Sequence, residues 1–389
     1  MNARSNKHNF LPSSYLYASF LMVRKTFKYR LYPTKAQASK FGAILEECRW
    51  LYNKMLEEHK YTWEVEQKVI GLYDQHARLP ALKSARPSLE TAHSQVLQNV
   101  CLRLDLAFKA FFRRVKAGEA PGHPRFKSFG RYDSFTFPQA PSGCQLRGEK
   151  LVVSKVGPVK IVLHRPVEGV VKTATIRRTA TGKWLAFFSC ELKPKPLPTS
   201  TERAGIDVGL MTFATLSNGE KIENPWFFRR EEKALAQAQR KLSATPKGTP
   251  KRVKLRKAVA RVHERSTNRR HDFIHQQSRR LVNRFGLIAV EDLNVNRMGR
   301  ERKFSKSIHD SAWSMFFACL SFKAEEAGRT MVAVNPAYTS QDCSRCGQRQ
   351  LMPLAERVYR CPSCGLELDR DHNASLNILA VGLHGLGLP

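Results

Sequence analysis

Basic and apolar residues alternate along residues 23–32, where the printed sequence reads VRKTFKYRLY. A period of two predicts a half-buried strand with one cationic face. Pro33 and Thr34 end this run and start a helical pattern that continues to about Ala117. Apolar stripes spaced for amphipathic helices lie within it, at Phe41, Ile44, Leu45 and Cys48 and then at Val96, Leu97, Val100, Leu104, Phe108, Phe111 and Phe112.

The pattern changes period over residues 123–196, where short alternating runs are separated by glycine and proline. Several short strands at regular spacing predict a barrel or a sandwich. The strand at 23–32 would complete it, which makes the helical block an insertion. The segment 193–198 reads KPKPLP, a stiff linker and a candidate domain boundary.

Beyond the linker, residues 203–223 are predicted to form a hairpin, because Asn218-Gly219 is a strong tight-turn signal. Residues 229–285 are predicted to be two antiparallel helices, since Pro246 and Pro250 interrupt the helical pattern. Further predicted elements are a buried strand at 287–290, a helix at 313–327, a strand at 330–334 and a last helix from about 369 to 379.

The 389 residues contain 66 Lys and Arg against 33 Asp and Glu, a net charge of +33. So large an excess repels itself in a compact fold and favours a polyanionic partner, most commonly nucleic acid. From Arg229 to Arg280 there are 17 basic and four acidic residues, a net +13. The sequence contains no run of about 18 apolar residues, the length that a membrane-spanning helix needs.

Residues 1–21 are mildly apolar but make a poor signal peptide, because Pro12 interrupts them and no small-residue cleavage site follows. We interpret them as an extension upstream of a native start at Met22. The nine cysteines are an odd number and five are scattered, which does not fit a secreted disulfide framework. A reducing cytoplasm is therefore expected.

The other four cysteines form two close pairs, Cys343/Cys346 and Cys361/Cys364, separated by fourteen residues. Four thiolates in two such knuckles fit one tetrahedral zinc ion, and a full set of cysteines leaves no open position, so the zinc would be structural. Gly347 and Gly365 follow the second cysteine of each pair, where a glycine would let backbone amides turn toward sulfur without a Cβ clash.

Acidic residues occur at three separated places: Asp207 on a strand, Glu291 and Asp292 at a strand end, and Asp369 and Asp371 at the start of the last helix. Carboxylates that hold two divalent ions about 4 Å apart are suited to phosphodiester hydrolysis. Oxygen ligands select Mg²⁺ or Mn²⁺. This order of elements is the layout of an RNase H-like nuclease sheet, although Asp369 is also a plausible helix cap.

Several segments resemble the TnpB (OrfB) family of insertion-sequence proteins, relatives of the type V CRISPR effectors. The similar segments occur in order from about Met22 to Ile378, and they are 29–34, 49–53, 124–127, 205–210, 266–275, 290–294, 339–347, 359–365 and 369–378. The departures are Ser375, where the family often has alanine, the extra residues 1–21 and a short tail after Ile378.

This resemblance implies an α+β multidomain chain. A wedge β-barrel is expected at 22–33 and 123–196, with an inserted helical recognition lobe at 34–122. An RNase H-like (RuvC) nuclease domain is expected at 200–338 and 367–389, interrupted by a zinc ribbon at 339–366 that binds target nucleic acid.

The resemblance also implies an RNA-guided endonuclease that cuts target DNA beside a short motif. Its catalytic, Mg²⁺-binding residues would be Asp207, Glu291 and Asp371, which selects Glu291 over Asp292 and Asp371 over Asp369. A guide RNA and target DNA are the expected partners, in a monomeric protein of the cytoplasm that associates with the nucleoid. Two alternatives stay open: a zinc-ribbon regulator of transposition without catalysis, and a transposase that joins strands.

Overall fold

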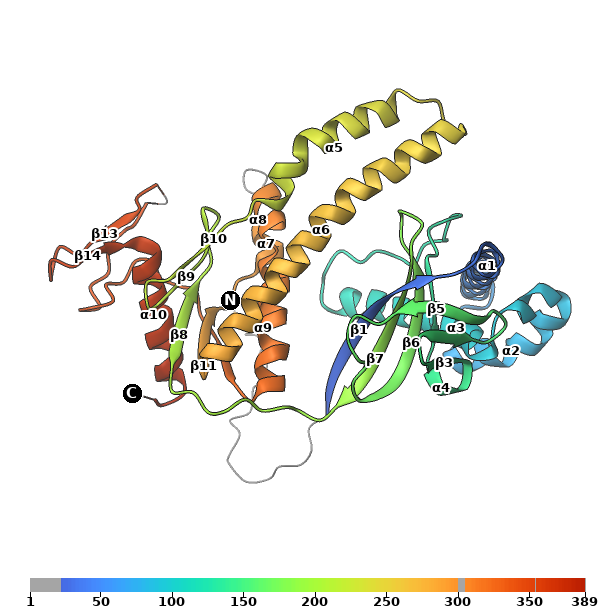
Figure 1. Cartoon of the computed structure of the whole chain (residues 1–389), viewed down its shortest axis with the longest axis horizontal. Coiled ribbons are helices and arrows are strands. Elements are labelled where there is room, and N and C mark those ends of the chain that lie inside the picture. Colours follow the sequence, from blue (N-terminus) through green and yellow to red (C-terminus); the bar gives the residue numbers. More distant parts are fainter. Residues whose placement is uncertain (1–21, 300–304, 354, 389) are drawn as a thin grey trace.

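The computed structural model describes residues 22–299, 305–353 and 355–388, so the proposed extension at 1–21 lies outside the described residues. Figure 1 shows two bodies joined by the extended segment that follows β7 and leads into β8. One body contains a seven-stranded sheet and helices α1 to α3. The other contains a five-stranded sheet, the long helices and the carboxyl-terminal end of the described chain.

The first body is built on a sheet with the strand order β2-β6-β7-β1-β5-β4-β3, paired antiparallel throughout. The sheet is barrel-like and nearly closed. Its strands are β1 (Val23–Tyr32), β2 (Ser134–Phe137), β3 (Cys144–Arg147), β4 (Lys150–Val153), β5 (Gly157–Val162), β6 (Val170–Arg178) and β7 (Trp184–Leu192). In β1 the buried residues Phe27, Tyr29 and Leu31 alternate with more exposed ones, which confirms the predicted period of two.

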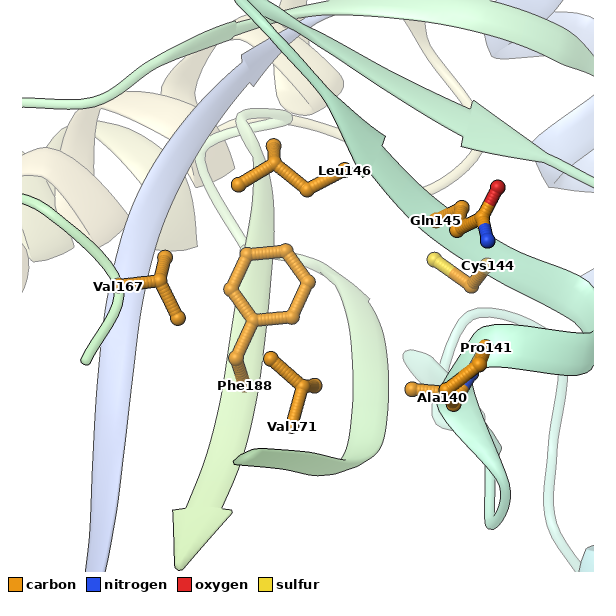
Figure 2. A pocket seen from close by; sticks show the side chains of 8 residues that line it. All are labelled: Ala140, Pro141, Cys144, Gln145, Leu146, Val167, Val171 and Phe188. Carbon is orange, nitrogen blue, oxygen red and sulfur yellow. The ribbon is translucent and has the colours of Figure 1, made fainter. Parts of the chain in front are cut away.

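The interior of this sheet is apolar and leaves a cavity of about 220 Å³. Figure 2 shows the side chains that line it: Phe188 of β7 faces Leu146 of β3, with Val167 and Val171 on the other side. The short helix α4 (Ala140–Gly143) and β3, which the sequence pattern did not predict, complete the lining. The cavity therefore lies at the edge of the barrel core, where buried Cys144 and Phe188 meet exposed Pro141 and Gln145.

Between β1 and β2 the chain forms the helices that the first stripes predicted. These are α1 (Lys35–Glu66), α2 (Leu72–Ala85), the 3-10 helix η1 (Pro87–Thr91) and α3 (Ser94–Lys116). Thr34 caps α1: its hydroxyl accepts from the Gln37 amide at 3.3 Å, and the Gln37 side chain accepts from the Thr34 amide at 3.0 Å. This reciprocal cap explains why the strand pattern gives way to a helix at this point.

The five-stranded sheet of the second body has the order β10-β9-β8-β11-β12. Its strands are β8 (Arg203–Asp207), β9 (Thr212–Leu216), β10 (Lys221–Glu223), β11 (Leu287–Glu291) and β12 (Thr330–Val334). Strands β8, β11 and β12 run parallel, whereas β9 and β10 continue from β8 as an antiparallel meander. The predicted hairpin is therefore part of a mixed sheet.

Helices cover both faces of this sheet. On one face, Leu287 and Ala289 of β11 pack with Ile378 of α10 (Arg370–Gly385). On the other, Ile288 and Val290 join a core with α6 (Pro250–Arg284) and α9 (Trp313–Ala327). Burial on both faces explains why β11 reads as a continuous apolar run.

The predicted antiparallel helix pair consists of α5 (Phe227–Ser243) and α6, which run side by side and extend away from the sheet (Figure 1). Thr249 caps α6 and Pro250 occupies its first position, as expected for a helix start. Two short helices, α7 (Val295–Met298) and α8 (Ser305–Ser311), precede α9. Among the described helices, none combines the length and apolarity needed to cross a membrane.

Candidate metal centres

Two of the predicted acidic residues stand at the ends of neighbouring parallel strands. Ile206 of β8 pairs with Val290 of β11, so Asp207 and Glu291 both follow this pair at the same edge of the sheet. Asp371 lies in the first turn of α10, a helix that packs on β8. The fold thus brings together three carboxylates that are more than 160 residues apart from first to last along the chain.

Burial and neighbouring charge both act on these acids. Burial raises the pKa of Asp207 well above its usual range, and the carboxylates of Glu291 and Asp371 raise it further. A Cβ atom at Gly209, two residues beyond Asp207, would lie 3.9 Å from Asp371 Oδ2. Three like charges at one edge of a sheet are unfavourable unless cations bind between them.

Glu291 is held by a hydroxyl from the segment that follows β12. Thr339 Oγ1 donates to Glu291 Oε1 at 2.6 Å. Burial raises the pKa of Glu291, and this hydrogen bond opposes the rise. The neighbouring Asp292 is exposed, and its amide donates to Val334 O at 2.8 Å. Of the two adjacent acids, Glu291 is therefore the one that the fold places beside Asp207.

Asp369 and Asp371 have different roles at the start of α10. Asp369 Oδ1 accepts from the amides of Asp371 and His372, each at 3.0 Å, and its Oδ2 pairs with Lys221 at 2.7 Å. Asp369 is thus the N-cap of α10, and its oxygens are already engaged. Burial and the nearby Asp369 raise the pKa of Asp371, whose closest cation is Arg357 at 3.9 Å.

The four paired cysteines converge as their spacing predicts. Their sulfur atoms all lie within 4.8 Å of one another, and within the described ranges no other group of three or more histidine, cysteine or acidic side chains is so close. Backbone amides of Cys364 and Ser363 donate to Cys361 and lower the pKa of its thiol to about 6. A tight set of four sulfur donors is suited to a single zinc ion.

The ribbon that carries these cysteines includes β13 (Val358–Arg360) and β14 (Glu367–Asp369), which pair antiparallel. Gly347 and Gly365 have φ values of 77° and 69°. No atom lies within 4 Å of a Cβ built on either glycine. The expectation that a Cβ would clash is therefore wrong; these positions favour glycine because their backbone is left-handed.

Two asparagines of α10, which sequence reasoning did not single out, join the ribbon to the acidic edge. Asn373 accepts from the Ser344 amide at 3.0 Å and donates to Asp342 O at 2.8 Å. Asn377 donates to the carbonyl oxygens of Thr339 and Asp342. The one feature of the sequence that could have indicated these contacts is the spacing of the two asparagines, which are four residues apart and so lie on the same face of the helix.

Three aromatic residues of the first body, Trp50, Tyr52 and Phe126, have different surroundings. Tyr52 is buried in the core of the first body. Trp50 is partly buried, and the Arg86 guanidinium lies 4.5 Å above its ring. Phe126 is exposed, with Lys60 Nζ 4.9 Å from its ring centre. Of the three, Phe126 alone presents a largely open ring.

Comparison with known proteins agrees with this architecture. Residues 187–302 match a family described as "Probable transposase" (OrfB_IS605). Residues 313–378, which include the cysteine ribbon, match the "Cas12f1-like, TNB domain", and residues 22–68 match a "Helix-turn-helix domain". In the structure this last segment is β1 followed by the single long helix α1 and the start of the next loop.

A solved Cas12f1–sgRNA–target DNA complex has the same fold, with a TM-score of 0.59 and 15% identity over 92% of this chain and 98% of that one. The fold is therefore that of the small Cas12-type effectors. A Streptomyces pristinaespiralis protein named "Putative RNA-guided DNA endonuclease" is 36% identical over 93% of this chain and 90% of its own length. The Escherichia coli K12 "Putative RNA-guided DNA endonuclease InsQ" is 30% identical over 92% of each chain. The chain belongs to the TnpB (OrfB) family of insertion-sequence proteins.

Proposed function

We propose that this protein is a transposon-associated, RNA-guided endonuclease that hydrolyses phosphodiester bonds of target DNA. The observation that carries the proposal is the meeting of Asp207, Glu291 and Asp371 at one edge of the β8–β11 sheet. Relatives that cover almost the whole chain are named as endonucleases of this kind. The sheet order, a three-stranded meander followed by two parallel strands, supports an RNase H-like (RuvC) domain.

The three carboxylates would hold two Mg²⁺ or Mn²⁺ ions. Bound there, the ions would activate the attacking water and stabilise the leaving oxygen. The residues fit this role, because oxygen donors suit these ions. Burial is the largest cause of the raised pKa values of Asp207, Glu291 and Asp371, and a bound cation would offset the cost of burying these carboxylates in their charged form. The chain's own part is to position the acids: Thr339 orients Glu291, and Asp369 fixes the start of α10 that carries Asp371.

Unpaired cations supply a path for a nucleic-acid backbone. In the distal half of the α5–α6 pair, Lys251, Lys254, Lys257 and Arg261 form no ion pair with any described residue. A cavity of about 410 Å³ separates this part of α6 from the barrel turn at 178–182, and Arg178, Arg256 and Lys257 line it. Lys and Arg along such a groove would bind phosphates without reading base sequence.

The proposed division of labour follows the fold. The barrel and the helical lobe at 34–122 would bind the guide RNA and the target DNA. The four-cysteine ribbon would hold one structural zinc ion. Its arginines, which would contact the target strand, are Arg345, Arg349, Arg357 and Arg360. We propose that sequence is read by base pairing with the guide RNA, and that the protein works in the cytoplasm at the nucleoid.

The test is cleavage of a plasmid target by the full chain, purified with its co-expressed guide RNA. Wild-type protein should linearise the plasmid with Mg²⁺ and leave free ends. Asp207→Asn should lose all detectable cleavage and keep target binding, because it removes a carboxylate ligand without removing a cation. Asp292→Asn is the matched control and should cleave normally.

Three results would contradict the proposal. Cleavage that survives Asp207→Asn would place the active site elsewhere. Joined rather than free DNA ends would identify a strand-transfer transposase, and full target binding without cleavage by the wild type would favour a regulator without catalysis.

A further inference from the structure

The helical lobe contains an aromatic cavity that the proposed cleavage mechanism does not use. Its volume is about 530 Å³, and it lies between the last turns of α1, the loop that follows, and the last turns of α3. Six rings line it: His59, Trp63, Phe108, Phe111, Phe112 and His123. So many ring faces around one cavity suit a planar ligand.

The rings are arranged as walls that leave free faces. His59 stacks on Phe108 with centres 4.6 Å apart and planes at 24°, whereas Phe111 and His123 meet nearly edge to face at 5.3 Å. Trp63 is 52% exposed and Phe112 is 45% exposed. Exposing large aromatic side chains to water is unfavourable, so a cavity with such exposed rings in its wall is typical of a ligand-binding site.

Polar groups at the same cavity indicate what the planar ligand carries. Lys60, Lys68 and Glu64 are part of the lining. Arg113, Arg114 and Lys116 do not line the cavity but follow Phe112 in the last turn of α3. His59 Nε2 lies 2.7 Å from the amide nitrogen of buried Gln75, while its Nδ1 has no partner among the described residues. The cavity thus combines several aromatic rings with two lysines and one glutamate.

We propose that this cavity binds one unstacked nucleobase of a single-stranded nucleic acid, with Trp63 and Phe112 stacking on the base. Lys60 and Lys68 bind the phosphates on either side of it. Stacking on aromatic rings tolerates every base, and lysines neutralise the flanking phosphates, so this combination is typical of sequence-independent strand binding. The proposal rests on the proposed function only in that the ligand is nucleic acid.

The test measures binding of two fluorescent probes by the full chain: a short single-stranded oligonucleotide, and an abasic oligomer with the same phosphates. Trp63→Ala and Phe112→Ala should each weaken binding of the first probe at least about fivefold and leave the abasic probe unchanged, since stacking one base commonly contributes that much. Lys60→Gln with Lys68→Gln should weaken both probes together. RNA and DNA versions of the first probe identify which strand supplies the base.

Tyr73→Ala is the matched control, because Tyr73 is 86% exposed on α2 and does not line the cavity. It should bind both probes as the wild type does, and Trp63→Phe should retain most of the preference for bases. Equal weakening of both probes by Trp63→Ala, or no weakening, would overturn the proposal. Thermal midpoints equal to that of Tyr73→Ala show that the variants fold. Asp207→Asn should keep the wild-type preference for the base-containing probe over the abasic probe. The binding result is therefore independent of whether the protein cleaves DNA.

Discussion

Thr339 Oγ1 donates a hydrogen bond of 2.6 Å to Glu291 Oε1, which ties the entrance of the cysteine ribbon to the acidic edge of the sheet. Thr339 O in turn accepts from Asn377 of α10. The two candidate metal centres are therefore joined through a few short polar contacts. A disturbance of the ribbon is expected to reach Glu291 along this route.

Replacing Thr339 tests this connection. Thr339→Val keeps the side-chain shape but removes the hydrogen bond that opposes the raised pKa of Glu291, so that pKa should rise further. Less Glu291 is then ionised at a given pH, and the acidic limb of the pH–rate profile should move to higher pH. The cleavage rate near neutral pH should fall about tenfold, the order expected for a hydrogen bond to a charged group. Thr339→Ser is the control and should behave as the wild type; a Thr339→Val profile without a shift would contradict the assigned role.

The raised pKa of Asp207 predicts a pH-dependent gain in stability on its removal. A carboxyl whose folded pKa lies above the unfolded value of 3.8 destabilises the fold increasingly as pH rises past 3.8, and the effect is complete above the folded pKa. Without divalent ions, Asp207→Asn should therefore melt higher than the wild type at pH 7, by ~2–4 °C for each kcal/mol of relief. The gap should close as the pH falls toward the unfolded value. Melting curves across pH in a chelator measure it, and added Mg²⁺ should stabilise only the wild type.

The cysteine ribbon predicts one zinc ion per chain. Cys361→Ser should release it, because the site loses one of four sulfur ligands, and should lower the melting temperature of the ribbon region. Elemental analysis of purified protein gives the stoichiometry. Cys319→Ser, a change at a buried thiol outside the cluster, should retain the metal. Wild-type protein purified without a chelator and found free of zinc would rule this prediction out.

Unpaired lysines on α6 predict the salt dependence of binding. Changing Lys251, Lys254 and Lys257 to Gln should flatten the plot of log affinity against log salt by about 2–3, since each neutralised phosphate of duplex DNA contributes ~0.9 to the slope. The control changes the same number of lysines that already pair with glutamates, Lys172, Lys195 and Lys306, and should flatten the slope less. Equal effects from both sets would mean that α6 does not contact the strand.

A close helix–sheet contact predicts the effect of a single methyl group. A Cβ at Gly205 would lie 2.1 Å from Ser375 O and 2.6 Å from the Leu379 amide nitrogen, both backbone atoms of α10. Gly205→Ala must push α10 away from β8, and the free energy of unfolding should fall by about 3 kcal/mol. Denaturant unfolding measures this. Gly42→Ala, at a half-buried position of α1 where no atom lies within 4 Å of the added Cβ, should be neutral or slightly stabilising.

Sequence periodicity located most of the elements but missed the shortest ones. The helix at 313–327 and the strand at 330–334 have the predicted bounds. Strands β13 and β14 have three residues each, too few to show alternation. Strand β3 has four residues and directly follows a short helix, so its alternating pattern is not recognisable in the sequence. The last helix was expected to end near 379 but continues to Gly385. No glycine or proline interrupts it before Gly382, and Gly382 is itself helical and lies close to Ala289 of β11.

The sequence by itself determined the positive charge, the four-cysteine spacing and the three acidic places, because these depend on residue types and local spacing alone. It left Glu291 against Asp292 and Asp369 against Asp371 open until family resemblance was considered. Only the tertiary structure showed that Asp369 is used as a helix cap, while the Asp371 carboxylate helps to raise the pKa of Asp207. It also showed that Thr339 and the α10 asparagines connect the two centres. Such contacts join residues far apart in the chain, and no local pattern encodes which side chains will meet when the sheet and helices pack.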